Sequence, residues 1–149
     1  MKKSLLFILL LILSGVPALA QTQPLIAQIA ESHIEGNVPN SEDFASFMRR
    51  DLDAYFQSVT GKAVEIKFEF LREGPTQTGI AYPKFYLWVK LFEKDVLINE
   101  GAVRVAAIEK KGFDVTNFLG RKEIEQNPEV IYSAFPRPVG DRIKNMIRQ

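Results

Sequence analysis

The stretch Lys84–Val115, with the sequence KFYLWVKLFEKDVLINEGAVRVAAIEKKGFDV, decides the fold of this chain. Hydrophobic residues dominate it, and two polar segments, Lys94-Asp95 and Lys110-Lys111-Gly112, interrupt it. Short polar segments between hydrophobic runs are typical of the turns in antiparallel hairpins. The stretch therefore predicts three antiparallel strands joined by two tight turns, with the last strand at Phe113–Phe118.

A two-residue turn at Lys94-Asp95 would also fix how the first two strands pair. Residue i would lie opposite residue 189 − i, since the two turn positions add up to that number. On this register Trp88 lies opposite Gly101, so that a large aromatic ring covers a glycine of the neighbouring strand. Tyr86 lies opposite Val103 and points the same way as Trp88.

The same register gives both sides of the sheet a hydrophobic surface. Phe85 points away from Tyr86 and shares its side with Leu87, Val89 and Arg104. A shift of one residue would exchange the two sides but would leave both hydrophobic. One helix cannot cover two faces. We therefore expect the second face to be covered by the C-terminal segments, by a second subunit or by a ligand.

Arg104 interrupts the hydrophobic run Ala102–Ala107 in the predicted central strand. An unpaired buried charge is costly, so this guanidinium needs a partner. One interpretation is an ion pair with a carboxylate such as Glu100 or Glu69, or a side chain that reaches solvent at the sheet margin. The other is that it orients an anionic or carbonyl group of a ligand held against aromatic rings. The candidate binding residues are Arg104, Tyr86, Trp88 and Phe85.

A strongly amphipathic helix is predicted before the sheet. Asn40 or Ser41 can cap its N-terminus, and Gly61 ends it. Its hydrophobic residues recur at helical spacing and are Phe44, Phe47, Met48, Leu52, Tyr55, Phe56 and Val59. The alternating segment Val64–Phe70 then predicts the first strand, and the Gly- and Pro-containing segment 73–79 predicts a loop.

Shorter helices are predicted at both ends of the chain. A flexible lead over residues 21–24 precedes a short helix at 25–34, which carries the single histidine, His33. After the sheet, a helical turn at 121–125 is followed by two helices, one with Pro128 at its first position and one near Val139–Ile147. We expect these C-terminal segments to pack on the sheet or, for the last of them, on a partner.

These elements predict one α+β domain over residues 21–149. N-terminal helices pack on a curled four-stranded antiparallel meander, and short C-terminal helices follow. A long helix followed by a curled antiparallel sheet, over roughly Asn40 to Phe118, resembles the cystatin-like and nuclear-transport-factor-like architecture. The resemblance implies either a binding module or a small-pocket enzyme. Cystatin inhibitors carry a Gln-x-Val-x-Gly motif, and the nearby Gln77-Thr78-Gly79-Ile80 does not match it, so inhibitor activity is not inferred.

Residues 1–20 have the features of a cleaved signal peptide. Lys2 and Lys3 precede the hydrophobic run Leu5–Leu13, and Ala18-Leu19-Ala20 has the small residues of a cleavage site. The run is shorter than the roughly 20 residues of a membrane-spanning helix. We therefore expect cleavage after Ala20, no membrane anchor, and a periplasmic or secreted protein.

Composition and motifs narrow the range of functions. The chain has no cysteine, which excludes disulfides and thiolate chemistry. Its formal net charge of +1, which falls to −1 without Lys2 and Lys3, does not favour nucleic-acid binding. The sequence contains none of the common catalytic, metal or phosphate-binding motifs, and we expect no cofactor.

The sequence is therefore most consistent with an exported, non-enzymatic binding domain. Its expected partner is a small apolar ligand in the cleft between helix and sheet, or another envelope protein. The alternatives are a small-pocket enzyme of the hydrolase or isomerase kind and a structural homo-oligomer. A homodimer is expected unless the C-terminal helices cover the second face of the sheet.

Overall fold

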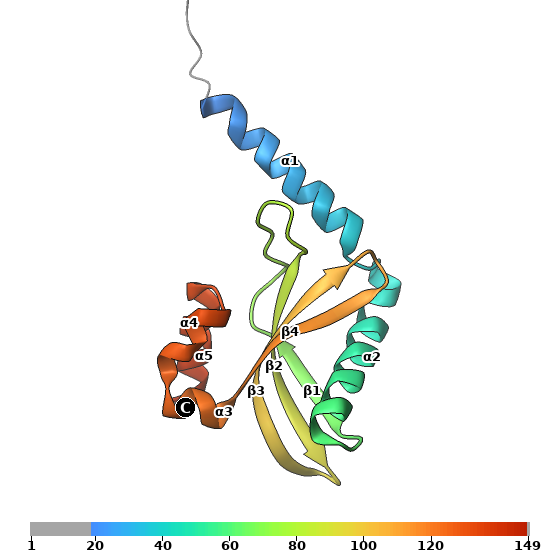
Figure 1. Ribbon diagram of the computed structural model, residues 1–149, viewed down its shortest axis with the longest axis vertical. Helices are drawn as coiled ribbons and strands as arrows, with labels where there is room; N and C mark the ends of the chain where they lie inside the picture. The colour runs from blue at the N-terminus through green and yellow to red at the C-terminus, as the bar shows by residue number, and fades with distance from the viewer. Residues whose placement is uncertain (1–18, 149) are drawn as a thin grey trace, which may run out of the picture.

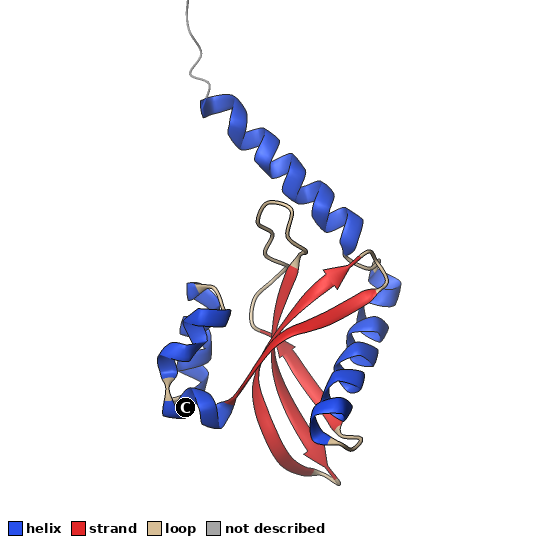
Figure 2. Ribbon diagram, viewed as in Figure 1, coloured by secondary structure: helices blue, strands red, loops and turns tan. Residues whose placement is uncertain are grey.

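The computed structural model describes residues 19–148, with side chains from Leu25 onward, and has an α+β fold (Figure 1). The order of elements is α1 (Leu19–Asn37), α2 (Ser41–Thr60), β1 (Glu65–Phe70), β2 (Lys84–Glu93), β3 (Val96–Ile108), β4 (Gly112–Gly120), α3 (Arg121–Gln126), a 3-10 turn (Pro128–Val130), α4 (Ile131–Ala134) and α5 (Arg137–Ile147). The four strands form one antiparallel sheet in the order β1-β2-β3-β4 (Figure 2). The predicted fold class and strand order are confirmed.

The predicted signal peptide lies almost wholly outside the described residues. Its last two residues, Leu19 and Ala20, begin α1. Helix α1 starts earlier than predicted, so the expected flexible lead at 21–24 is helical in the structure. Within residues 19–148, none of the helices combines the length and the hydrophobicity that a membrane span requires.

Helix α2 has the ends that the sequence predicts. The Asn40 side chain accepts a hydrogen bond from the backbone N–H of Asp43 at 2.9 Å, and this satisfies one of the unpaired donors of the first turn. Gly61 ends the helix with φ of 73°, a left-handed conformation that glycine adopts without steric cost, and its N–H donates to the Gln57 carbonyl. Both ends are therefore specified locally.

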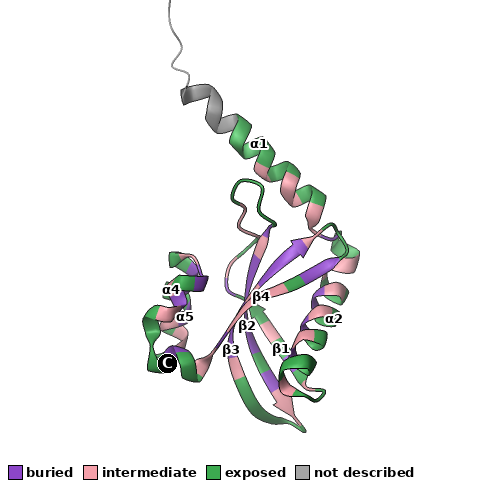
Figure 3. Cartoon of the chain, in the orientation of Figure 1, coloured by how far each residue is buried: buried purple, intermediate pink, exposed green. Residues whose placement is uncertain are grey.

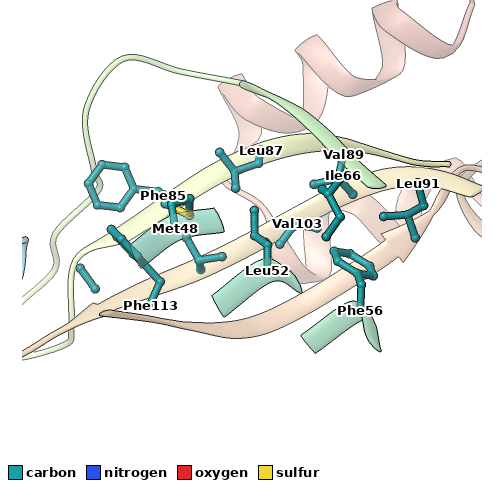
Figure 4. Close-up of a cluster of buried hydrophobic side chains, with 12 residues drawn as sticks. Met48, Leu52, Phe56, Ile66, Phe85, Leu87, Val89, Leu91, Val103 and Phe113 are labelled. Atoms are coloured by element: carbon teal, nitrogen blue, oxygen red, sulfur yellow. The ribbon is translucent and has the colours of Figure 1, made fainter. Parts of the chain in front are cut away.

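Helix α2 covers one face of the sheet, which we call the inner face (Figure 4). Met48, Leu52 and Phe56 of the helix are buried there. They pack on a set of inward-pointing strand residues that includes Ile66, Phe85, Leu87, Val89, Leu91, Val103, Val105, Ala107 and Phe113. This cluster is the main hydrophobic core of the protein.

The C-terminal helices cover the opposite face, which we call the outer face (Figure 1). Tyr86, Trp88, Ala102 and Leu119 of the sheet lie there with Leu71. They pack against buried residues of the C-terminal segments, namely Ile124, Ile131, Ala134, Phe135, Val139 and Ile143. The prediction that the C-terminal segments pack on the sheet is confirmed. The argument for a homodimer depended on an uncovered second face, so it no longer applies.

The register of β2 and β3 is one residue away from the predicted one over most of its length. At the turn the prediction holds, since Glu93 lies opposite Val96 and Phe92 opposite Leu97. Leu91 then lies opposite Asn99, so Ile98 is an extra residue and forms a bulge. Beyond the bulge every pair is displaced by one, and the predicted assignment of β3 residues to the two faces is exchanged.

Helix α1 projects away from the sheet and does not cover it (Figure 1, Figure 3). Leu25, Ile26 and Ile29 on this helix are exposed. Its C-terminal end is attached to the β3–β4 turn, where Asn37 accepts hydrogen bonds from the backbone N–H groups of Glu109 and Lys110. Of the two N-terminal helices, α2 alone therefore packs on the sheet.

Candidate functional site

The four predicted binding residues do not form one site. Phe85 lies on the inner face, whereas Tyr86, Trp88 and Arg104 lie on the outer face. The bulge at Ile98 is the reason, because it places Arg104 opposite Tyr86 and moves it away from the side of Phe85. The prediction that Arg104 shares a face with Phe85 is wrong.

Arg104 connects the sheet to the C-terminal helices. Its Nη1 donates to the backbone carbonyl of Ala134, the last residue of α4, at 2.8 Å. Its Nε donates to the Thr116 hydroxyl on β4 at 2.9 Å. The expected ion pair with Glu100 or Glu69 is absent from the described residues. These contacts give Arg104 a structural role at the end of a helix, where unpaired carbonyls attract cations.

Trp88 and Tyr86 use their polar atoms within the protein. Trp88 Nε1 donates to Glu100 at 3.2 Å, and Arg121 donates to the same carboxylate at 2.7 Å. Burial by itself would raise the pKa of Glu100, but the hydrogen bonds from Arg121 and Trp88 hold it below its ordinary value. The Tyr86 hydroxyl bonds to the Thr76 hydroxyl at 2.6 Å. Trp88 therefore helps to hold α3 through Glu100, and Tyr86 helps to hold the loop before β2 through Thr76.

Phe85 is part of a different feature, a cleft at the β1 edge of the sheet. The cleft has a volume of about 480 Å³ and is lined by Phe44, Phe70, Arg72, Glu73, Gly74, Phe85 and Arg142. We call it the phenylalanine cleft. Its size lies in the range of small-molecule sites.

Three phenylalanines from three elements form the apolar part of the phenylalanine cleft. Phe44 comes from the first turns of α2, Phe70 from the end of β1 and Phe85 from the start of β2. The ring of Phe44 lies 5.2 Å from that of Phe85 and 6.2 Å from that of Phe70. Phe70 is 38% exposed although it lies on the same side of β1 as the buried Ile66 and therefore points toward the inner face. The hydrophobic core is therefore open to solvent at this corner.

Two arginines and a glutamate form the polar part of the phenylalanine cleft. Arg142, on α5, donates from Nη1 to the Leu71 carbonyl at 2.9 Å. Its Nη2 lies 4.0 Å from a carboxylate oxygen of Glu69. Arg72 is half-buried, and its guanidinium makes no hydrogen bond or ion pair to another residue in the range 25–148. Glu73 is exposed beside them. The cleft thus combines an aromatic wall with cationic hydrogen-bond donors.

A smaller hollow lies on the outer face next to Trp88. Its volume is about 260 Å³, and Lys67, Phe68, Glu69 and Lys90 line it together with the tryptophan. Trp88 is only 3% exposed, so charged and exposed side chains provide most of this surface. The hollow offers a ligand much less apolar contact than the phenylalanine cleft does.

Groups suited to acid–base or metal chemistry are not gathered in the phenylalanine cleft. Residues 25–148 contain no cluster of three histidine or acidic side chains that could hold a metal ion. His33 lies on α1 and does not line the cleft. Burial and the charge of Arg104 lower the pKa of Lys84, an effect that Asp114 partly offsets. Lys84 lines none of the cavities described above.

Sequence reasoning named one residue of the phenylalanine cleft, Phe85, and missed the others. In the sequence, Phe44 is one of the hydrophobic residues of the predicted helix, Phe70 ends the predicted first strand, and Arg142 lies within the last predicted helix. The available signal was the final Phe70 of an alternating strand, with Arg72 two residues later. Comparison with known protein families, curated proteins and solved structures gave no match to this chain.

Proposed function

We propose that this chain is an exported, non-enzymatic domain that binds a small apolar ligand in the phenylalanine cleft. The observation that carries the proposal is the aromatic wall of Phe44, Phe70 and Phe85 in a cleft of about 480 Å³, where the Phe70 ring is open to solvent. Exposed aromatic side chains in a concave site lose unfavourable contact with water when an apolar molecule covers them. Phe70 is 38% exposed, so covering the rest of its ring contributes about 1 kcal/mol.

The chemistry of the lining favours binding over catalysis. Glu73 is its one ionisable group besides the arginines, and it is exposed to solvent. Enzyme sites usually hold a buried acid or base whose pKa has been shifted for its task. An enzyme of the nuclear-transport-factor-like kind would place such a group deep in the cleft.

Titration with the neutral fluorophore N-phenyl-1-naphthylamine tests the binding proposal. We expect the full chain to enhance its fluorescence with saturation, as apolar probes do when they leave water. The Phe70→Ser variant removes one exposed wall of the cleft and should weaken binding about threefold or more. Leu97→Ser removes an exposed side chain at the distant β2–β3 turn and should bind like the wild type. Absence of saturable binding by the wild-type protein would reject the proposal.

Export rests on the sequence pattern of residues 1–20 and has its own test. Protein recovered from the envelope fraction of its cell should begin at Gln21. Recovery of protein that still begins at Met1 would contradict export with cleavage at the predicted site.

A further inference from the structure

We propose that the ligand of the phenylalanine cleft carries a single carboxylate, which binds to Arg72 and Arg142. This inference rests on the proposed function and specifies its ligand as an amphipathic monocarboxylate, such as a medium-chain fatty acid. The apolar body would lie on the phenylalanine rings, and the carboxylate would lie at the guanidinium groups. Both parts of the ligand thus find matching surfaces within one set of lining residues.

Arg142 is fixed in position and still has donors to offer. A guanidinium has five N–H donors, and the Leu71 carbonyl accepts from one nitrogen of Arg142. The second terminal nitrogen is 4.0 Å from Glu69, beyond ordinary hydrogen-bond distance. The bond to Leu71 holds the side chain of this exposed residue beside the cleft. A carboxylate can therefore bind the other nitrogen without breaking a strong contact.

Arg72 brings a second guanidinium to the same rim. It follows Leu71 directly, so the backbone group that holds Arg142 belongs to the residue next to Arg72. Arg72 is half-buried and has no partner within residues 25–148. Planar guanidinium groups match carboxylates in geometry and form paired, charge-assisted hydrogen bonds with them. Two arginines beside an aromatic wall are a suitable binding site for such a group.

The acidic residues near the rim limit the charge that the ligand can carry. Glu73 lies in the same lining as the two arginines, and the Glu69 carboxylate lies 4.0 Å from Arg142 Nη2. A monocarboxylate brings a single negative charge to the guanidinium groups. A phosphate with two negative charges would leave an excess negative charge beside Glu73. The electrostatics therefore favour a monoanion.

Competition between decanoate and 1-decanol tests the inference, because the two compounds have the same chain length and differ in the head group. Each would displace N-phenyl-1-naphthylamine from the full-length protein. We expect decanoate to compete about tenfold better than decanol, because charge-assisted hydrogen bonds to the head group strengthen its binding. The preference should shrink as salt is added, since the rim is exposed and its charges are screened.

Arginine variants locate the head group. Arg72→Gln and Arg142→Gln should each reduce the preference for decanoate while binding of the neutral fluorophore persists. Arg137→Gln, at an exposed position on the same helix as Arg142, is the matched control and should keep the preference. Because Arg142 also binds the Leu71 carbonyl, Arg72→Gln provides the variant that leaves that contact intact.

The outcomes separate this inference from the proposed function. If the fluorophore itself does not bind, the apolar site is rejected. If the fluorophore binds but decanoate and decanol compete equally, the carboxylate inference is overturned and the apolar site stands. A preference that survives in both Arg72→Gln and Arg142→Gln would also overturn it.

Discussion

The two faces of the sheet are covered in different ways. On the inner face one continuous helix of 20 residues supplies Met48, Leu52 and Phe56, all of them fully buried. On the outer face four short helical segments supply the covering hydrophobic residues, and the longest segment has 11 residues. Arginine side chains fasten these segments to the rest of the molecule, with Arg104 and Arg142 each donating to a backbone carbonyl.

The difference shows how helix length determines what a covering layer needs. Helix α2 caps both of its ends with its own residues, and it needs the sheet mainly to bury its apolar side. Helices of one or two turns are unstable alone, and their unpaired terminal carbonyls must find donors. Arg104 supplies such a donor from the sheet. The inner layer therefore depends mainly on hydrophobic burial, and the outer layer depends also on specific polar contacts.

The largest effect is expected on the inner face, from Phe56→Ala. This ring is fully buried between α2 and the sheet, so the change should cost about 3–5 kcal/mol of unfolding free energy. Urea denaturation measures the loss. Val59→Ala, on an exposed part of the same helix, is the control and should stay within about 0.5 kcal/mol of wild type. Similar losses for both variants would contradict the assignment of the inner core.

A smaller effect is expected on the outer face, from Arg104→Met. The substitution keeps most of the stem and removes the donors to Ala134 and Thr116, so the loss should be about 1–3 kcal/mol. Hydrogen exchange should quicken in the region 121–147 and change little in α2. Lys122→Met, at an exposed position nearby, serves as the control.

A melting temperature of Arg104→Met at or above that of the wild type would contradict the conclusion that the outer layer depends on specific polar contacts. Arg104 would then contribute nothing to the attachment of the C-terminal segments. Its role in orienting a ligand, which the sequence also suggested, would become the better interpretation.

The smallest effect is expected from Glu100→Gln, and it should depend on pH. The folded-state pKa of Glu100 is lowered, so its contribution to stability is present above the ordinary glutamate value of about 4.3 and is lost as pH falls through the folded-state pKa. The variant should be less stable than wild type at pH 7, by on the order of 1 kcal/mol, and should approach it in acid.

Chemical denaturation of both proteins between pH 7 and pH 3 measures this difference. Glu123→Gln, at an exposed position of α3, is the control. A stability gap for Glu100→Gln that stayed constant with pH would show that the interaction with Arg121 and Trp88 does not depend on charge.

The sequence was sufficient to predict the helix and the turn whose ends are determined by their own residues. Asn40 and Gly61 define α2 through their own backbone and side-chain chemistry. Lys94 and Asp95 both adopt positive φ, as a two-residue hairpin turn requires, so the predicted turn is correct. The α+β class followed because the predicted helices lie before and after one run of consecutive, unambiguous strands.

The register and the site could not be predicted in the same way. A turn fixes pairing only up to the first irregularity, and nothing in the alternation of β3 indicates that Ile98 is unpaired. The phenylalanine cleft joins Phe44, Phe70 and Arg142, which lie far apart in the sequence and meet only after both layers have packed. Each of these residues has an ordinary local pattern, so none of them is distinctive before folding.

The bulge at Ile98 has a consequence for how this chain tolerates changes in length. Because Ile98 has no partner on β2, a deletion of this one residue would leave Leu91 opposite Asn99 and every later pair unchanged. A deletion within residues 101–105 would instead move part of β3 by one position relative to its neighbours and would interchange core and outer residues. The tip of this hairpin is therefore a place where a one-codon deletion preserves the fold, whereas the same deletion a few residues further along would destroy it.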